Sequence, residues 1–285
     1  MSRGLRTRLP GSRTKAFKTA IGLFIGLVWF LPFVGVLIES IRPYEEVSNG
    51  WWRMDQLHLT LVSYVKIFSG TTLPMAGPLW NSFFSSVLGA LFPILLGSMA
   101  AYAFARQWLP AKTVVIVIIL CLMAIPAQMI AIPAFRRLYA LGLLDTYTGV
   151  ILMNTVTSLP WIMFFMMNVI RMQDVQIEEA GIIDGASDYR IFRSIVLPQC
   201  GPSLISAGLL QFVWSWNTFF WPLILIFNPK KMMVTQVIPM LRGQFYTDWG
   251  ILTAGATLVM VVPIIVFLAF QRYYIQGSVG FAVDK

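Results

Sequence analysis

Long runs of apolar residues, separated by shorter polar stretches, dominate the pattern of this chain. Each run is close to the roughly 20 residues that an α-helix needs to cross the hydrocarbon core of a bilayer. The pattern predicts six membrane-spanning helices, near residues 19–41, 79–105, 113–134, 146–170, 203–227 and 250–271. We therefore expect an all-α integral membrane protein that crosses the membrane several times.

Two of the predicted helices carry residues that shape how helices pack or bend. Gly97, Ala101 and Ala105 recur at four-residue spacing in the second, a pattern of small residues that lets membrane helices approach closely. Pro126 and Pro133 lie in the third, where each removes a backbone hydrogen bond and favours a kink or a break. Such breaks are tolerated in lipid only where protein or a water-filled cavity satisfies the freed carbonyl groups.

Composition and charge support the membrane assignment. Hydrophobic residues make up 58% of the 285 residues, the mean hydropathy is +0.74, and 12% of the residues are charged, against about 25% in soluble domains. A net charge of +9 could suggest nucleic acid, but the basic residues concentrate at the ends of apolar runs and in the N-terminal stretch MSRGLRTRLPGSRTK. Membrane topology explains this distribution, so we expect contact with lipid and not with nucleic acid.

The distribution of lysine and arginine predicts how the chain is oriented. With the N-terminus inside, cytoplasmic segments hold 13 of the 21 basic residues, and six of these precede the first apolar run. Positive charge favours the cytoplasmic side, and the first helix usually dominates. We therefore expect a cytoplasmic basic segment at 1–18, a six-helix transmembrane domain at 19–272, and a cytoplasmic tail at 273–285.

Between the fourth and fifth predicted helices the sequence inserts a charged segment (residues 174–198), on the side assigned to the cytoplasm. Asp174 can cap the start of a helix. The apolar face of that helix is predicted to contain Ile177, Ala180 and Gly181, at the spacing of one helical turn. Both glutamates of the helix are expected to project away from this face.

A second short helix is predicted to follow a glycine turn. Gly185 suits the left-handed conformation that closes many helices. Ser187 can cap the next helix, and Pro198 is expected to end it. The apolar stripe of this helix is formed by Ile191, Phe192, Ile195 and Val196. The two helices together predict a rigid, amphipathic shape that presents a solid surface to a partner.

Polar and aromatic side chains at membrane depth are the candidates for a solute pathway. They are Gln128, Asn154, Gln211, Trp214, Asn217 and Trp221. Rigid aromatic faces beside an amide can stack on the apolar faces of a sugar ring, while hydrogen bonds hold its hydroxyl groups. The alternatives are an interhelical hydrogen bond for Gln128 and an interfacial aromatic belt for the tryptophans.

The sequence lacks the residues that several other functions need. No charged residue lies in the middle of a predicted span, which argues against a carrier coupled to protons or ions. The carboxylates of the charged segment have no histidine or nucleophile near them, so we assign no catalytic residue. Two cysteines without a CxxC motif and a single histidine predict no metal site. The phosphate-binding pattern GxxxxGK(S/T) is absent, so we expect this chain to bind no ATP.

The charged segment is similar to the signature loop of permease subunits in binding-protein-dependent ABC importers. That signature is E-A-A, three residues, G, nine residues and I-x-L-P. The matching residues here are Glu179, Ala180, Gly181, Gly185, Ile195, Leu197 and Pro198. Gly181 stands where the family has a second alanine, a small change that weakens a helix slightly. The stretches EEAGIIDGASDYRIFRSIVLP, LGLLDTYTGVIL and FQRYYIQGSVGFAV resemble the carbohydrate-uptake branch, in particular the smaller, six-helix permease of maltose-type importers.

This resemblance implies a permease subunit that imports a sugar or small oligosaccharide and is not itself an enzyme. In the family, the signature loop docks on a separate cytoplasmic ATPase, which binds ATP and Mg²⁺. The residues assigned to that contact are Glu178, Glu179, Ala180, Gly181, Asp184, Gly185, Ala186, Ile195, Leu197 and Pro198. The resemblance also implies a second homologous permease, a pair of ATPase subunits and an external solute-binding protein, in the inner membrane of a bacterium or archaeon.

Three alternatives stay open. The same class of importer could carry a polyol, glycerol phosphate or an osmolyte, because a permease sequence specifies its solute poorly. The chain could also be a secondary transporter that works alone, although its spans lack buried charge. A membrane-embedded enzyme is the third alternative, although the sequence shows no nucleophile, metal cluster or acid–base pair.

Overall fold

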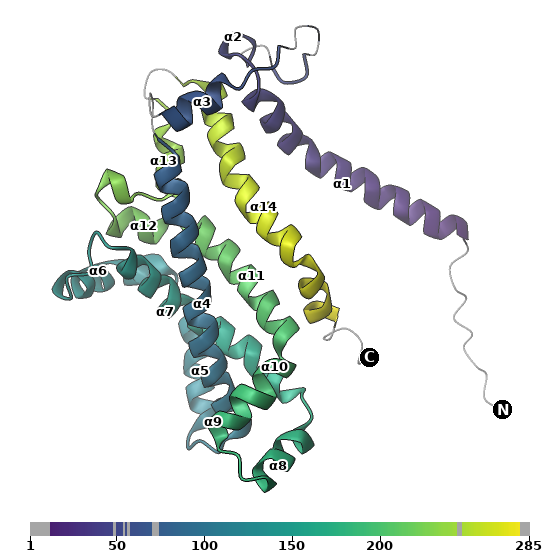
Figure 1. Cartoon of the computed structure of the whole chain (residues 1–285), viewed down its shortest axis with the longest axis vertical. Helices are drawn as coiled ribbons and strands as arrows, with labels where there is room; N and C mark the ends of the chain where they lie inside the picture. Colours follow the sequence, from purple (N-terminus) through teal and green to yellow (C-terminus); the bar gives the residue numbers. More distant parts are fainter. Residues whose placement is uncertain are drawn as a thin grey trace.

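The computed structural model is a bundle of long helices with shorter helices at both of its ends (Figure 1). It describes residues 12–47, 50–53, 55, 58–69, 74–243 and 247–279. No strand occurs in these ranges, which confirms the predicted all-α fold. Part of each predicted terminal segment, 1–11 and 280–285, lies outside the described residues.

Four long helices match four of the six predicted spans. They are α1 (Ser12–Ser40), α4 (Ala76–Arg106), α7 (Tyr147–Arg171) and α14 (Trp249–Val279). Each is long and apolar enough to cross a bilayer. The last of them runs beyond the predicted end at 271, so the predicted tail begins as a continuation of the helix.

The third predicted span is a broken helix. α5 (Lys112–Met123) ends just before Pro126, and the two pieces that follow, η1 (Ala127–Ile130) and α6 (Ala131–Ala140), turn away from it by 96°. The expected break at Pro126 is confirmed. Pro133 does not add a second kink, because it lies in the first turn of α6, where a backbone N–H has no helical partner to lose.

The fifth predicted span, 203–227, is shorter than expected and bent. α11 (Gly201–Asn217) ends well before 227, and α12 (Phe220–Leu225) follows after an interruption. Three short helical pieces precede α11 and meet it at 78°. They are α9 (Asp188–Ile191), the π-helical turn η2 (Phe192–Val196) and α10 (Leu197–Gln199).

Pro198 does not end the second helix of the charged segment, contrary to expectation. The backbone N–H of Leu197 bonds to the carbonyl oxygen of Phe192, five residues back, so the helix widens to a π turn directly before the proline. The helical path then continues through α10 and bends only at Cys200. A widened turn before Pro198 relaxes the contact between its ring and the preceding turn that would otherwise stop an α-helix.

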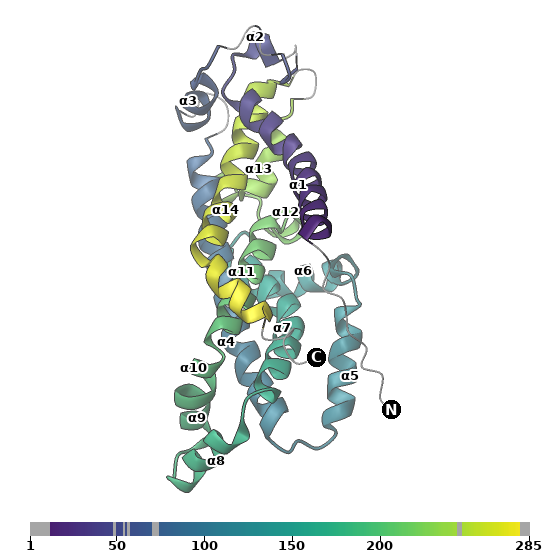
Figure 2. The same cartoon turned by 90° about the vertical axis from the view of Figure 1, so that its right-hand side faces the viewer.

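Small residues bring α4 close to its neighbours. A Cβ atom added at Gly97 would lie 2.7 Å from Ile162 Cγ2 of α7, and one added at Gly89 would lie 2.5 Å from Ser215 Oγ of α11. Ala101, in the same predicted pattern, is fully buried. The expected close packing of this helix is confirmed, and α7 and α11 both pack along it (Figure 2).

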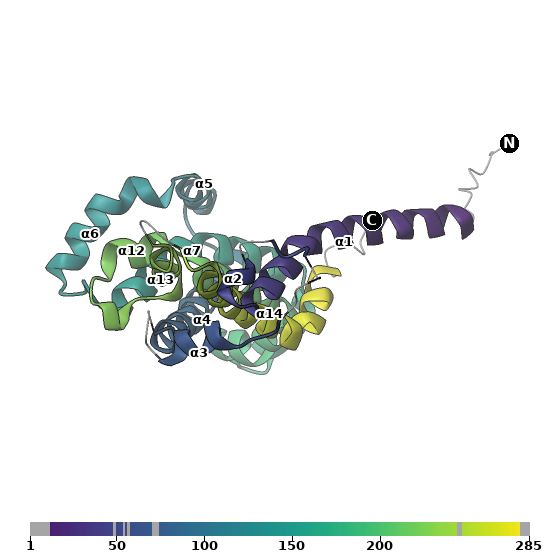
Figure 3. The same cartoon turned by 90° about the horizontal axis from the view of Figure 1, so that it is seen from above.

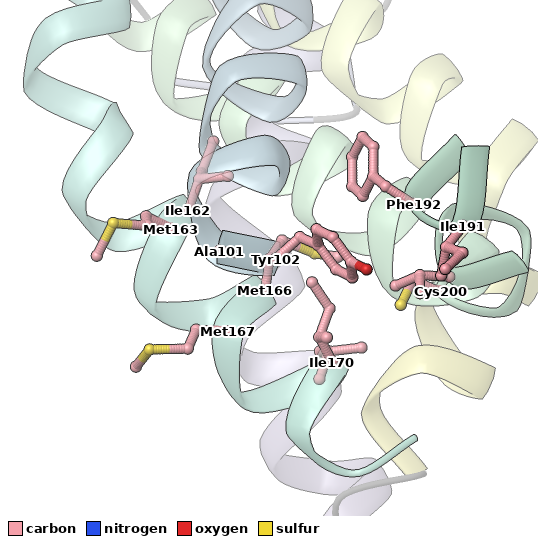
Figure 4. Close-up of a cluster of buried hydrophobic side chains, with 12 residues drawn as sticks. Ala101, Tyr102, Ile162, Met163, Met166, Met167, Ile170, Ile191, Phe192 and Cys200 are labelled. Carbon is pink, nitrogen blue, oxygen red and sulfur yellow. The ribbon is translucent and has the colours of Figure 1, made fainter. Parts of the chain in front are cut away.

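The described residues form three buried apolar clusters, one of them at the end that carries the charged segment. There, Tyr102 of α4 and Ile170 of α7 lie beside Phe192 and Cys200 (Figure 4). α8 (Val175–Ile183) marks this end of the molecule in Figure 1. The remaining short elements are α2 (Tyr44–Val47), α3 (Val62–Ser69), η3 (Pro229–Lys231) and α13 (Val234–Met240).

α1 extends away from the bundle (Figure 3). Its side chains from Phe17 to Phe33 are exposed, and only its last part packs against α14. An apolar surface of this length would not stay open to water. Lipid or another membrane helix must therefore cover it.

Candidate docking surface and polar pocket

The charged segment begins and turns as its sequence predicts. Asp174 caps α8 by accepting a hydrogen bond of 3.0 Å from a backbone N–H in the first turn. Gly185 follows the helix with a φ of +76°, in the left-handed region. The N–H of Gly185 bonds to the carbonyl of Ile182 at 2.9 Å, and that of Ala186 bonds to the carbonyl of Gly181 at 3.0 Å. This pair of bonds is the Schellman motif, which favours glycine at the left-handed position.

The second helix of the charged segment is only partly capped as expected. Ser187 has the extended backbone of a capping residue, but its side chain makes no capping hydrogen bond. Next to it, Asp188 Oδ2 accepts a hydrogen bond from Gln107 Nε2, just past the end of α4, at 3.1 Å. The predicted apolar stripe is confirmed: three of its residues are buried and one is half-buried, namely Ile191, Phe192, Val196 and Ile195.

The inward face of α8 differs from the predicted one. Ile177 is 49% exposed and Ala180 is exposed, so neither packs inward. The buried residues are Gly181 and Glu178, and Glu178 is only 5% exposed. Glu178 turns inward because it forms an ion pair with Arg106 of α4, at 2.8 Å. The prediction that both glutamates project away from the packed face is therefore wrong for the first of them.

The outer surface of the charged segment combines apolar side chains with carboxylates. Ile182 and Ile183 are exposed directly before the Gly185 turn, and Ile183 is 87% exposed. Glu179 and Asp184 are exposed on the same helix and its cap. Sequence reasoning missed both isoleucines, although two apolar residues beside a polar turn are a signal for a partner surface. A surface of this kind fits an apolar groove with basic residues at its rim.

The ten residues assigned to a partner contact differ in burial. The exposed ones are Glu179, Ala180, Asp184, Gly185 and Pro198, and the half-buried ones are Ala186, Ile195 and Leu197. The buried ones are Glu178 and Gly181. The first two groups are accessible to another protein, whereas the two buried residues act within the chain.

A second candidate site is a polar pocket of about 280 Å³, bordered by α7, α11 and α12. Four of the six predicted pathway residues line it, namely Asn154, Gln211, Trp214 and Trp221. Gln128 does not line it and is exposed on η1. Asn217 does not line it either, because its side chain donates a hydrogen bond of 2.8 Å to the carbonyl of Val213 in its own helix.

Gln211 is a buried residue of the polar pocket, and both polar atoms of its amide are hydrogen-bonded within the chain. Its Nε2 donates to Ser158 Oγ at 2.6 Å and to the carbonyl of Gly89 at 3.1 Å, and its Oε1 accepts from Trp161 Nε1 at 3.0 Å. These bonds join α4, α7 and α11, so Gln211 holds the pocket together. Trp161, which sequence reasoning missed, also meets Trp214 edge to face, with ring centroids 5.2 Å apart.

The chemistry of the pocket is polar but uncharged. Hydroxyl groups come from Thr157, Ser158, Ser215 and Thr218, and no Asp, Glu, Lys, Arg or His lies among the lining residues. Aromatic rings beside hydroxyl and amide groups suit a neutral solute that has both apolar faces and hydroxyl groups. Throughout the described parts of the chain, no group of three His, Cys, Asp or Glu residues could hold a metal ion.

Trp161 also lines a larger, mainly apolar cavity. This cavity measures about 790 Å³ and extends along α7 to its last residue, Arg171. Its other lining residues are Met123, Phe164, Phe165, Asn168 and Met172. The indole of Trp161 therefore stands between the polar pocket and a space that leads towards the end of the molecule with the charged segment.

Asp145 fixes the loops beside the polar pocket. It has a φ of +54°, and its carboxylate accepts hydrogen bonds from the backbone N–H groups of Asn228 at 2.9 Å and Phe227 at 3.0 Å. Lys231 Nζ lies 3.1 Å from the same carboxylate. These backbone bonds, together with Lys231, hold the pKa of the Asp145 carboxyl below its usual range. The loop before α7 is thereby tied to the loop after α12.

A known family matches most of the region that holds these features. The family described as the inner membrane component of binding-protein-dependent transport systems matches residues 93–278. The matched part includes the charged segment and all residues that line the two cavities.

Individual relatives match over almost the whole chain. The probable ABC transporter permease protein of Pyrococcus horikoshii is 44% identical, covering 92% of this chain and 95% of the relative. The osmoprotective compounds uptake permease protein of Synechocystis sp. is 33% identical, covering 92% and 90%. The arabinooligosaccharides transport system permease protein of Halalkalibacterium halodurans is 30% identical, covering 89% and 91%.

Among solved structures, the fold is similar to a chain of a bacterial ABC transporter involved in the import of the acidic polysaccharide alginate. The TM-score is 0.78 with 21% sequence identity, and the match covers 94% of this chain and 100% of the other. This likeness supports the arrangement of the helices.

Proposed function

The chain belongs to the family of inner membrane components of binding-protein-dependent transport systems, and from this premise we propose that it imports a sugar or small oligosaccharide. It is a multi-pass transmembrane permease subunit of an ABC importer. One relative is a permease for arabino-oligosaccharides and another for osmoprotective compounds. Because these relatives carry different solutes, the residues that line the pocket of this chain decide which solute fits it.

The lining of the polar pocket is the observation that supports a sugar. Trp161 and Trp214 offer aromatic rings for the C–H faces of a sugar ring, and the surrounding hydroxyl groups and the amide of Asn154 can exchange hydrogen bonds with its hydroxyls. Glycerol phosphate would need a cationic partner, which the lining residues do not include. A neutral polyol or osmolyte is the second candidate, favoured by the Synechocystis relative.

The charged segment is the proposed contact with a separate ATPase, which would bind ATP and Mg²⁺ while this chain binds no cofactor. The exposed Ile182 and Ile183 can enter an apolar groove, and Glu179 and Asp184 can meet basic residues around it. The Schellman motif at Gly185 keeps the two short helices at a fixed angle, so a displacement of the segment by the ATPase can be passed on to the membrane helices. Catalysis would then reside entirely in the ATPase.

The other proposed partners follow from surfaces that a single chain leaves open. The apolar side chains of α1 and α5 are exposed, which suits a second homologous permease and the surrounding lipid. An external solute-binding protein would deliver the solute at the end opposite to the charged segment. We propose that the protein lies in the inner membrane of a bacterium or archaeon with both termini and the charged segment in the cytoplasm, an orientation that the distribution of basic residues supports.

Cross-linking tests the docking surface. In a chain whose Cys121 and Cys200 are replaced by alanine, Ile183→Cys should cross-link to the ATPase subunit of the assembled importer. Lys230→Cys, on exposed η3, is the matched control and should not. A cross-link from Lys230→Cys alone would place the ATPase on the wrong end and end the proposal.

Transport in proteoliposomes tests the solute. The assembled importer, supplied with its binding protein and ATP, should accumulate a labelled oligosaccharide, and a neutral polyol should compete less well. Uptake driven by an ion gradient without any ATPase would instead identify a secondary transporter. Preferred uptake of the polyol or of a phosphorylated solute would refute the sugar assignment.

A further inference from the structure

Arg106 occupies a half-buried position at the end of α4 where three parts of the chain meet. Its Nε and one terminal nitrogen each lie 2.8 Å from Glu178 Oε1 of α8. The same terminal nitrogen donates to the carbonyl oxygen of Ile170 at 2.8 Å and to that of Gln173 at 3.0 Å. The side chains of Arg106 and Glu178 are 14% and 6% exposed, so this pair is shielded from water.

These contacts satisfy groups that would otherwise be costly to bury. The last carbonyl groups of a helix have no partner within the helix, and a cation there also balances the helix dipole. At the end of α7, Arg106 supplies this cation and gives the Ile170 carbonyl a second donor beside the N–H of Gln173, which bonds to it at 3.1 Å. Gln173, whose carbonyl also accepts from Arg106, is the second residue after the helix. The remaining charge of Arg106 is balanced by Glu178. A single guanidinium thus joins the ends of α4 and α7 to α8.

Two further contacts join the end of α4 to the second helix of the charged segment. The ring of Tyr102 lies 5.3 Å from that of Phe192 in η2, measured between centroids (Figure 4). Gln107 donates to Asp188 of α9. The end of α4 therefore contacts both helices of the charged segment. Arg106 contacts the first, and Tyr102 and Gln107 contact the second.

The connection to α11, the next helix along the chain, is different in kind. The helical path bends by 78° at this junction, and Gly201 at the start of α11 has no heavy atom within 4 Å of where a Cβ would lie. Side-chain contacts tie the charged segment to α4 and α7, which come before it, and the segment meets α11 at an angle.

We propose that Arg106 is a positioning residue that makes the charged segment and the ends of α4 and α7 one rigid body. A displacement of α8 then moves the α4–α7 pair directly, while the bend at Cys200 takes up the difference in angle to α11. This inference rests on the proposed function, because it assumes that an ATPase moves α8. Since α7 carries Trp161 and Asn154, the motion reaches both cavities.

Replacement of Arg106 tests the coupling. In the assembled importer, Arg106→Gln should lower the amount of solute moved per ATP hydrolysed by roughly tenfold, a size typical of coupling between sites. Arg136→Gln, an exposed arginine of α6 outside the charged segment and both cavities, is the matched control and should leave this ratio unchanged. The Ile183→Cys cross-link to the ATPase should persist in Arg106→Gln. Its absence from the parent protein would count against the proposed function itself, whereas a normal transport ratio in Arg106→Gln would overturn the role of Arg106.

A reversible cross-link keeps the proposal testable even if Arg106→Gln folds poorly. In a chain without Cys121 and Cys200, Gln107→Cys and Asp188→Cys can be joined by a short bifunctional thiol reagent after folding. If the end of α4 and the charged segment move as one body, transport should continue with the link in place. Loss of transport that a reductant restores would show that the two parts move relative to each other, and this would refute the proposal.

Discussion

The turn at Gly185 allows the mechanical role of the charged segment to be tested by a change in backbone preference alone. Its φ of +76° is in the region that residues with a Cβ atom avoid, yet no heavy atom of this chain lies within 4 Å of where that Cβ would be. A substitution therefore causes no clash within the folded chain. The cost is conformational, about 1–2 kcal/mol for an ordinary L-residue, and larger for a β-branched one.

A cost of this size is enough to change the turn. About 1.4 kcal/mol shifts the equilibrium between the intact turn and an opened one tenfold. Opening breaks the bonds from the N–H groups of Gly185 and Ala186 to the end of α8 and frees the angle between the two short helices. We expect Gly185→Val to lower solute transport per ATP hydrolysed strongly, Gly185→Ala to lower it less, and Gly185→Asn to lower it least, because asparagine tolerates the left-handed region.

The assay is transport and ATP hydrolysis by the same proteoliposomes, with the amount of the permease in the membrane measured in parallel. That amount should stay constant, because the turn lies between membrane spans and not within one. Normal transport by Gly185→Val would refute the coupling role of the turn. Equal losses in all three variants would show that the space at this position, filled by a partner, matters and that the backbone conformation does not.

Further substitutions test the packing of α4, the polar pocket and the loops that Asp145 ties together. Gly97→Ala places a Cβ 2.7 Å from a side chain of α7 and should destabilise the protein by about 1–3 kcal/mol, seen as a lower melting temperature in detergent. Gly77→Ala, in open space on the same helix, should leave it unchanged. Trp214→Ala should raise the solute concentration for half-maximal transport without lowering the melting temperature, because this side chain is 58% exposed. Asp145 has a depressed pKa, so its stabilising contribution is complete above about pH 4 and is lost as the pH falls through the lower pKa of the folded state. The melting temperature should therefore fall less on acidification in Asp145→Asn than in the parent protein.

Most of the fold could be predicted because bilayer thickness sets the length of an apolar run. The four unbroken spans could be predicted from the length and hydropathy of the apolar runs alone. The prediction was weaker where a span is interrupted. Pro126 signals its break through its own covalent structure, but the early end of α11 at Asn217 has no comparable signal, since the apolar run continues into α12. Hydropathy alone cannot show where an apolar segment leaves the helical conformation.

In the candidate sites, too, features formed by neighbouring residues could be predicted, and features that depend on distant residues could not. The turn at Gly185 could be predicted because a Schellman motif is formed by neighbouring residues. The burial of Glu178 could not, because its partner Arg106 lies 72 residues away in the sequence. Trp161 was missed for a similar reason: its place in the pocket depends on Gln211, 50 residues further along the chain.

Two adjacent glutamates of α8 differ in their surroundings, because only the first of them reaches Arg106. Successive residues of a helix point about 100° apart, so α8 can turn only one of Glu178 and Glu179 inward. Gly181 shares the inward face with Glu178, and a Cβ there would lie 2.8 Å from Cδ1, the flexible end of the Ile195 side chain of η2. The ion pair with Arg106 holds Glu178 inside the chain and leaves Glu179 exposed for a partner, a division that no local property of the two glutamates could reveal.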